Sequence, residues 1–379
     1  MKKILFISNI ARKVNTFSLA SISAARSFDF SFHMAANWST ATKEQIESDQ
    51  NEYNVKIHNI DLERSPFSKA NITAYRQLVA LIQKERIDYI HCNTPVGGLL
   101  GRLASKKCKV KKIIYQVHGF HFYKGAPKLN WLLYYPIEKW LARYTDAIIT
   151  INKEDYARAK RFKLRKNGQV FYVPGVGIRT EEFSAATDKR NDFINENNLS
   201  EDSVLLISAG DLNKNKNNAV IIRAIAKLNN RRIHYFLCGV GNEKENLALL
   251  ADALGVGEQI HFLGYRKDIK ELLKSADIFV MPSFREGLSR SMMEAMASGL
   301  PCIASKIRGN VDLVEDGVNG FLRKPTDVDG FSAAILRIAD DAALQETMRK
   351  NNLEKIQSFD ISVVAEEIRT IYKEVLSEK

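Results

Sequence analysis

The sequence predicts an α/β fold with two domains, each built on a parallel, doubly wound sheet, and three observations predict it. The chain has 379 residues, more than one ordinary hydrophobic core accommodates. Short apolar runs alternate with amphipathic helical stretches, which indicates repeated β-α-β units. A polar segment rich in helix and strand breakers, near residues 175–200, interrupts this alternation. We therefore expect an N-terminal domain at residues 1–180 and a C-terminal domain at residues 181–360.

The first domain begins with the apolar run at residues 4–7, which Ser8 and Asn9 end. The apolar core of a signal peptide needs roughly 7 to 15 residues, so this run is interpreted as a buried first strand. The other elements expected in this domain are strands at residues 89–91, 112–117, 147–151 and 170–173, and helices at residues 74–85 and 130–144.

The second domain repeats the pattern. Its strands are expected at residues 204–209, 234–238, 259–263, 278–281 and 301–304. An amphipathic C-terminal helix within residues 361–379 can pack back on the first domain. Parallel sheets bind ligands at the carboxyl ends of their strands, so we expect the functional site in a cleft between the two domains.

Composition excludes several classes of protein. Apolar residues make up 45% and charged residues 26% of the chain, as in ordinary globular proteins. No uninterrupted apolar stretch approaches about 18 residues, so no transmembrane helix is expected. The cysteines are widely separated and form no CxxC pair, which argues against a disulfide framework or a zinc site and fits the cytoplasm. They are Cys92, Cys108, Cys238 and Cys302.

The charge is unevenly distributed. The chain carries a net charge of +12, yet residues 1–180 hold 30 Lys and Arg against 13 Asp and Glu. The excess of basic residues in this half of the chain either keeps the protein in solution or forms a surface that contacts anionic lipid headgroups or an anionic acceptor. Nucleic acid is not expected as a partner, because no recognition motif accompanies the charge. The aromatic segment 131–141 is either a packed helix or a contact with a membrane interface.

The strongest motif runs from Glu286 to Glu294, after the strand at residues 278–281. Ser289 or Ser291 can cap the helix that follows. A helix N-terminus binds anions, which suits a diphosphate. Because the two glutamates are eight residues apart, one can meet a sugar at the mouth of the helix and the other a nucleotide farther along it.

This segment resembles the E-x7-E motif of family 4 of the retaining glycosyltransferases, and residues 276–283, 295–301 and 315–322 are also typical of that family. The resemblance implies a GT-B fold, with two Rossmann-like domains facing a cleft. Residues 117–122 and 137–140 resemble a subgroup that acts in bacterial capsule and exopolysaccharide assembly.

The resemblance also implies roles for individual residues. Glu286 would face the donor sugar and Glu294 the ribose, while Lys216 would bind the donor diphosphate and His118 would contact the sugar from the first domain. The catalytic residues are thus expected to be His118, Lys216 and Glu286. The donor-binding residues are expected to be Lys216, Arg266 (through its backbone), Glu286, Gly287, Leu288, Ser289 and Glu294.

One position departs from the family pattern. Asp211 stands where the family commonly has an arginine that meets the diphosphate. Either Asp211 turns away, or another cation such as Lys214 or Arg290 compensates. The D-x-D sequence at residues 327–329 is interpreted as a turn and helix cap, and neither a metal nor a cofactor is expected.

The predicted function is therefore retaining transfer of a sugar from a UDP-sugar to a glycan or polyprenyl-linked acceptor in surface polysaccharide biosynthesis. The enzyme is expected in the cytoplasm, with peripheral contact at the inner face of the cell membrane as a further hypothesis. Two alternatives stay open: a nucleotide-sugar 2-epimerase, and a non-catalytic partner subunit of another glycosyltransferase.

Overall fold

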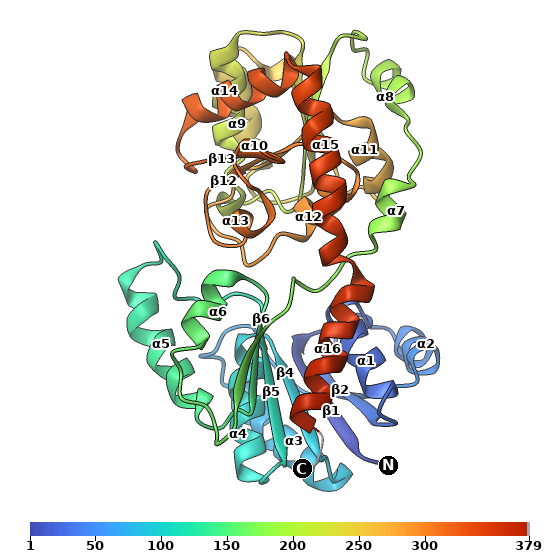
Figure 1. Ribbon diagram of the computed structural model, residues 1–379, viewed down its shortest axis with the longest axis vertical. Coiled ribbons are helices and arrows are strands. Elements are labelled where there is room, and N and C mark those ends of the chain that lie inside the picture. The colour runs from blue at the N-terminus through green and yellow to red at the C-terminus, as the bar shows by residue number, and fades with distance from the viewer. Residues whose placement is uncertain (377–379) are drawn as a thin grey trace. The chain divides into compact units, whose positions relative to one another are not determined.

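The computed structural model describes residues 1–376 and divides into two compact units. Unit 1 comprises Met1–Gly177 together with the C-terminal segment that begins at Ile361, and unit 2 comprises Ile178–Asp360. The chain thus passes from unit 1 to unit 2 after Gly177 and returns after Asp360, where the C-terminal helix begins (Figure 1).

Unit 1 contains a seven-stranded parallel sheet with the order β3-β2-β1-β4-β5-β6-β7. Its strands are β1 (Lys3–Ile10), β2 (Ser31–Asn37), β3 (Lys56–Asn59), β4 (Tyr89–Asn93), β5 (Lys112–Val117), β6 (Ala147–Thr150) and β7 (Gln169–Tyr172). Its helices are α1 (Thr16–Arg26), α2 (Lys43–Tyr53), α3 (Ala70–Glu85), α4 (Pro95–Lys107), α5 (Lys128–Ala142), α6 (Lys153–Ala159) and α16 (Ile361–Leu376).

Unit 2 contains a six-stranded parallel sheet with the order β10-β9-β8-β11-β12-β13. Its strands are β8 (Val204–Ala209), β9 (Ile233–Cys238), β10 (Ile260–Gly264), β11 (Ile278–Met281), β12 (Cys302–Ser305) and β13 (Gly320–Arg323). Its α-helices are α7 (Thr180–Ser184), α8 (Arg190–Glu196), α9 (Ala219–Leu228), α10 (Lys244–Ala253), α11 (Ile269–Ser275), α12 (Arg290–Ala297), α13 (Asn310–Leu313), α14 (Val328–Ala339) and α15 (Ala342–Ile356). The 3₁₀ turns are η1 (Lys214–Lys216), η2 (Gly257–Gln259) and η3 (Gln357–Phe359).

Each sheet is buried on both faces. In β1, Ile4 and Phe6 join one apolar cluster, while Leu5 and Ile7 join another on the opposite face. Successive side chains of a strand point to opposite faces, so such a strand must be apolar throughout when helices cover both sides. This is why the sequence shows continuous apolar runs, and it confirms the expected α/β fold with two Rossmann-like parallel-sheet domains.

The C-terminal helix α16 packs against α1 in unit 1. Its apolar stripe, which includes Val364 and Ile368, is buried there. The Tyr372 hydroxyl lies 2.8 Å from Nδ1 of the buried His91 in β4. The helix therefore completes one face of a sheet that was built mainly from the first 177 residues.

Three strands escape the sequence pattern. β3 has no fully buried residue, because it is an edge strand, and β2 and β13 contain polar or small residues that mask their apolar pattern. The segment interpreted as a polar linker also holds two short helices, α7 and α8, which belong to unit 2. Within residues 1–376, no helix combines the length and the hydropathy that crossing a bilayer requires.

Candidate functional site

Two loops of unit 2 meet at the carboxyl ends of β8 and β11. These strands are neighbours in the sheet, although about 70 residues separate them in the chain. The loop after β8 carries Lys216, and the loop after β11 carries Glu286. Parallel strands end at the same edge of a sheet, so both side chains reach one place.

A local turn positions Lys216. The Asn213 side chain accepts a hydrogen bond from the backbone N–H of Lys216 at 3.1 Å, which closes the 3₁₀ turn η1. Asn217 then adopts a left-handed conformation with φ of 54°, which asparagine tolerates better than most residues. Its side-chain amide donates to the carbonyl of Pro282 at 3.0 Å, and so anchors the turn to the loop that follows β11.

Asn215 adds two further hydrogen bonds between the loops. Its carbonyl accepts from the backbone N–H of Phe284 at 2.8 Å, and its side-chain amide donates to the carbonyl of Arg285 at 3.0 Å. These bonds lie directly before Glu286 in the chain. Asn215 and Asn217 were not among the residues predicted from the sequence, although the Asn-rich run 213–218 is a visible signal of turn structure.

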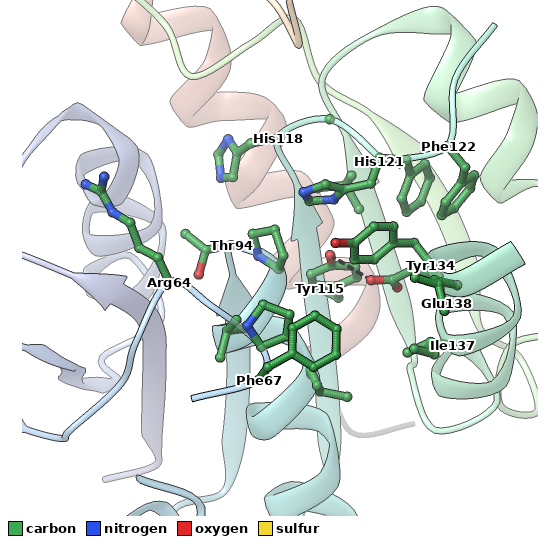
Figure 2. A pocket seen from close by; sticks show the side chains of 18 residues that line it. Arg64, Phe67, Thr94, Tyr115, His118, His121, Phe122, Tyr134, Ile137 and Glu138 are labelled. Carbon is green, nitrogen blue, oxygen red and sulfur yellow. Dashed lines mark hydrogen bonds between the residues drawn. The ribbon is translucent and has the colours of Figure 1, made fainter. Parts of the chain in front are cut away.

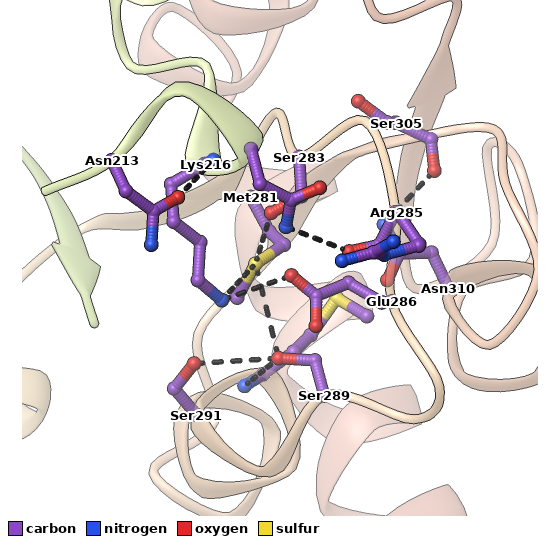
Figure 3. Close-up of polar contacts among 12 residues, drawn as sticks. Asn213, Lys216, Met281, Ser283, Arg285, Glu286, Ser289, Ser291, Ser305 and Asn310 are labelled. Atoms are coloured by element: carbon purple, nitrogen blue, oxygen red, sulfur yellow. Dashed lines mark hydrogen bonds and ion pairs between the residues drawn. The ribbon is translucent and has the colours of Figure 1, made fainter. Parts of the chain in front are cut away.

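The amine of Lys216 lies 2.9 Å from Oε1 of Glu286, and both side chains are largely buried, with 22% and 14% of their surface exposed. Figure 3 shows the two groups pointing toward each other between the loops. Arg308, which was also not among the predicted residues, donates from Nε to the carbonyl of Glu286 at 3.2 Å. The unit thus holds a cation and a carboxylate in contact at the edge of its sheet.

Glycine is required beside this pair. A Cβ atom at Gly309, where φ is 82°, would lie 2.3 Å from the carbonyl oxygen of Gly287. Only glycine permits this approach at a positive φ. Leu288, the next residue, packs against the apolar core of unit 2. Gly287 and Leu288 therefore shape and anchor the loop that carries Glu286.

The helix α12 begins as expected. The Ser289 hydroxyl accepts from the backbone N–H of Met292 at 3.3 Å and is the N-cap. One turn into the helix, Glu294 accepts from Nε of Arg290 at 2.8 Å. Burial raises the pKa of the Glu294 carboxyl, although Arg290 counteracts part of this effect. Arg290 is thus engaged by Glu294.

Two candidate residues have no contact with this pair. Arg266 follows the edge strand β10, and its guanidinium forms a two-point ion pair with Asp268. Asp211 is exposed at the end of β8, in a small hollow that Lys216 also lines.

The D-x-D segment at residues 327–329 is a helix cap, since Asp327 accepts from the N–H of Gly330 at 2.8 Å. No cluster of His, Cys, Asp and Glu suited to a metal ion occurs within residues 1–376.

His118 lies in unit 1, directly after β5. Its Nε2 is 2.8 Å from Oδ1 of Asn93, the last residue of β4. An amide oxygen only accepts hydrogen bonds, so Nε2 carries the proton. Burial lowers the pKa of His118 to about 4, so its ring is neutral at pH 7. Nδ1 is then a lone-pair acceptor, and among the described residues it has no partner.

A cavity of about 310 Å³ lies beside His118 within unit 1. Its wall includes Thr94, whose φ of 64° and ψ of 157° fall in a region that residues other than glycine rarely adopt. The Thr94 hydroxyl donates to Oδ1 of Asn9 at 2.7 Å, which holds this conformation. Backbone strain of this kind concentrates at ligand sites, yet nothing in the sequence signalled it.

Glu138 and Tyr115 line the cavity, and both contact Arg102, which does not line it. Arg102 is fully buried, donates to Glu138 at 2.8 Å and stacks on the Tyr115 ring, with 3.8 Å between its guanidinium carbon and the ring centre. His121 stacks on Tyr134 at the wall, with ring centres 4.5 Å apart. Figure 2 shows Tyr115, His121, Tyr134 and Glu138 around the hollow.

Comparisons with known proteins agree on the family. Residues 189–355 match the family described as "Glycosyl transferases group 1", and residues 3–152 match "Glycosyl transferase 4-like". The chain is 36% identical over 376 residues to EpsD of Bacillus subtilis (strain 168), a protein that bears the name of a glycosyltransferase, and the match covers 98% of this chain and 96% of EpsD.

A second relative is the UDP-Gal:α-D-GlcNAc-diphosphoundecaprenol α-1,3-galactosyltransferase of Escherichia coli. It is 29% identical over 308 residues, which cover 80% of this chain and 79% of the relative. Among solved structures, HepE of Anabaena in complex with UDP and glucose shares the fold with a TM-score of 0.79 and 19% identity, over 99% of this chain and 100% of that one. The family matches and these relatives show that the chain belongs to the group 1, family 4-like glycosyltransferases, and its fold is that of the GT-B glycosyltransferases.

Proposed function

We propose that this glycosyltransferase moves a sugar from a UDP-sugar, with retention of anomeric configuration, to a polyprenyl-linked or glycan acceptor in bacterial surface polysaccharide biosynthesis. The observation that carries the proposal is the contact between Lys216 and Glu286 at the carboxyl ends of β8 and β11. This pair supplies one charge for each half of a nucleotide-sugar: a cation for the diphosphate and a carboxylate for sugar hydroxyls.

Lys216 is proposed to bind the donor diphosphate. In the free protein its amine is held by Glu286, and the two loops keep it in place through Asn213 and Asn215. When the diphosphate departs, negative charge develops on it, and a preorganised cation stabilises that charge without reorganisation. Glu286, once the bound diphosphate replaces it as the partner of Lys216, is free to accept hydrogen bonds from the donor sugar.

The donor nucleoside is proposed to lie along α12 and the loop before it. Ser289 and the backbone of Gly287 and Leu288 border the place for the diphosphate, and Glu294 accepts from the ribose hydroxyls. Its raised pKa reflects a largely desolvated carboxylate, which forms strong hydrogen bonds once a ligand excludes water. The backbone at Arg266 is the proposed contact of the base.

His118 is proposed to contact the sugar as a neutral acceptor. Asn93 orients the ring through Nε2, and Nδ1, which is buried without a partner among the described residues, is proposed to become the acceptor of a sugar hydroxyl when the donor binds. A pKa of about 4 keeps the ring neutral and avoids a cation beside a sugar whose anomeric carbon becomes positive. Retention is proposed from the family resemblance, with the leaving diphosphate taking the proton of the acceptor hydroxyl.

The acceptor is proposed to be lipid-linked, because the Escherichia coli relative is named for a diphosphoundecaprenol substrate. The basic composition of residues 1–180 and the exposed apolar side chains of α5, such as Leu132 and Trp140, suit peripheral contact with an anionic membrane. The proposed location is therefore the cytoplasmic face of the membrane.

The test is a donor panel. UDP-, GDP- and ADP-sugars are titrated into the protein by calorimetry, and the donor that binds is incubated with lipid-linked acceptors. The anomeric configuration of the product is read by NMR. We expect one UDP-sugar to bind and an α-linked product from an α-linked donor. A product of inverted configuration contradicts the retaining mechanism. Epimerisation of the donor in the absence of any acceptor favours the 2-epimerase. Donor binding without turnover favours a partner subunit that Asp211 makes inactive.

A further inference from the structure

The cavity beside His118 is mostly apolar, and the proposed donor chemistry does not use its interior. At about 310 Å³ it has the size of the smaller pockets that hold organic ligands. Its apolar wall includes Phe67, Val96, Leu99, Phe122, Leu133 and Ile137. Figure 2 shows His118 and the Arg64 guanidinium toward one side of the lining, and Phe67 and Ile137 toward the other.

The one carboxylate in the wall is compensated. Glu138 accepts from Arg102 at 2.8 Å and from the Tyr115 hydroxyl at 3.2 Å. The buried guanidinium is also stacked on the Tyr115 ring. The cavity wall therefore presents no uncompensated negative charge that an apolar or anionic ligand would have to desolvate.

The apolar wall is incompletely covered by protein. Phe67 is 83% exposed, and Leu133 and Ile137 are both about two-fifths exposed, although all three line the cavity. Adjacent apolar side chains left in water mark a binding surface more often than chance. A sugar would leave these apolar side chains unmatched, because hydroxyl groups need polar partners that Phe67, Leu133 and Ile137 do not offer.

We propose that this cavity binds the isoprenoid chain next to the phosphates of a polyprenyl-diphosphate acceptor. Arg64, which is exposed and has no ion pair among the described residues, stands at the rim for the phosphates, and the acceptor sugar points toward His118. The inference rests on the proposed function, and it adds the part of the acceptor that unit 1 recognises and the residues that do so.

A series of short probes tests the inference in detergent-free buffer. Inorganic diphosphate and dimethylallyl, geranyl and farnesyl diphosphate are titrated into the full chain by calorimetry. Each buried methylene raises affinity about fourfold. We therefore expect affinity to rise at least about tenfold with each added isoprene unit, with inorganic diphosphate weakest. An affinity that does not depend on chain length overturns the inference.

Substitutions at two positions of α5, five residues apart, distinguish binding in the cavity from binding on the helix surface. Ile137→Trp fills the cavity, whereas Leu132→Trp adds the same side chain at a residue that is 73% exposed and outside it. We expect Ile137→Trp to weaken farnesyl diphosphate binding at least tenfold and Leu132→Trp to change it less than twofold. Equal losses would mean that the surface of α5 holds the chain, and the cavity proposal would fail.

Phe67→Ala provides a variant that cannot disturb the core, because this side chain is almost fully exposed. It should weaken farnesyl diphosphate at least threefold, and unchanged affinity counts against the proposed wall. UDP and the UDP-sugar panel are titrated into the same preparations. Donor binding with no chain-length dependence refutes the cavity inference alone. Failure to bind any nucleotide sugar refutes the proposed function, whatever the isoprenoid probes do.

Discussion

Replacing Lys216 with alanine removes the cation that unit 2 holds against Glu286 at 2.9 Å. A hydrogen bond from a charged group to a ligand contributes about 1.5–3 kcal/mol, and each 1.4 kcal/mol changes a dissociation constant tenfold. We therefore expect UDP to bind about ten- to a hundredfold more weakly to Lys216→Ala. Isothermal calorimetry at constant ionic strength measures the change.

The same substitution leaves Glu286 without its ion-pair partner. Exposed pairs contribute about 0–1 kcal/mol, whereas removing one partner of a fully buried pair costs about 3–5 kcal/mol. With 22% and 14% of the two side chains exposed, we expect a loss of about 1–2 kcal/mol in the stability of unit 2. The tryptophans Trp38, Trp131 and Trp140 all lie in unit 1, so far-UV circular dichroism must follow this transition.

Lys214→Ala is the matched control. Lys214 is exposed in the same turn, two residues before Lys216, and has no ion pair among the described residues. It should retain UDP affinity within about twofold, as expected of an exposed charge. The reasoning is refuted if the two variants weaken UDP equally, or if Lys216→Ala binds UDP like the parent.

Four further changes probe other parts of the molecule. Glu294→Gln should weaken UDP binding about tenfold, measured by calorimetry. Burial raises the pKa of Glu294, so the parent protein loses folding stability as pH rises and this carboxyl ionises. The variant lacks that loss and should therefore be more stable than the parent at pH 7.5, measured by circular dichroism. The pKa of His118 is lowered to about 4 in the folded protein, so the imidazole is protonated at higher pH in the unfolded chain than in the folded one. Unit 1 should therefore lose stability as pH falls from about 6.5 to 4. His118→Gln should reduce this pH dependence of stability, followed by tryptophan fluorescence. Arg102→Ala strands Glu138 and should destabilise unit 1 by about 3–5 kcal/mol, measured by the same fluorescence in denaturant. Asp211→Arg should strengthen UDP binding about two- to fivefold by calorimetry, because it exchanges a repelling charge for an attracting one.

Each of these has an outcome that counts against it. Unaltered UDP affinity in Glu294→Gln removes the ribose role, and an unchanged acid slope in His118→Gln means that other buried histidines, such as His91, dominate. A small loss in Arg102→Ala would show that water reaches Glu138. Weaker UDP binding in Asp211→Arg would show that the aspartate is part of the donor site.

Much of the local structure could be read from the sequence, because its causes are local. Apolar runs indicated β8 and β11, and the serines after Glu286 indicated the start of α12, which Ser289 caps. The roles of His118, Lys216, Glu286 and Glu294 came from a family resemblance and stay predictions. The cleft expected between the domains also stays a prediction.

By itself, the sequence determined two parallel-sheet domains, most of their strands and the helix that follows Glu286. Periodicity, capping and breakers act over a few residues, so they are legible without the fold. Tertiary structure alone decided that β8 lies beside β11, which brings Lys216 to Glu286 across 70 residues. It also decided that Asn93 orients His118 and that α16 returns to unit 1. Such contacts depend on which strands pair and which faces pack, and no short window of sequence records those choices.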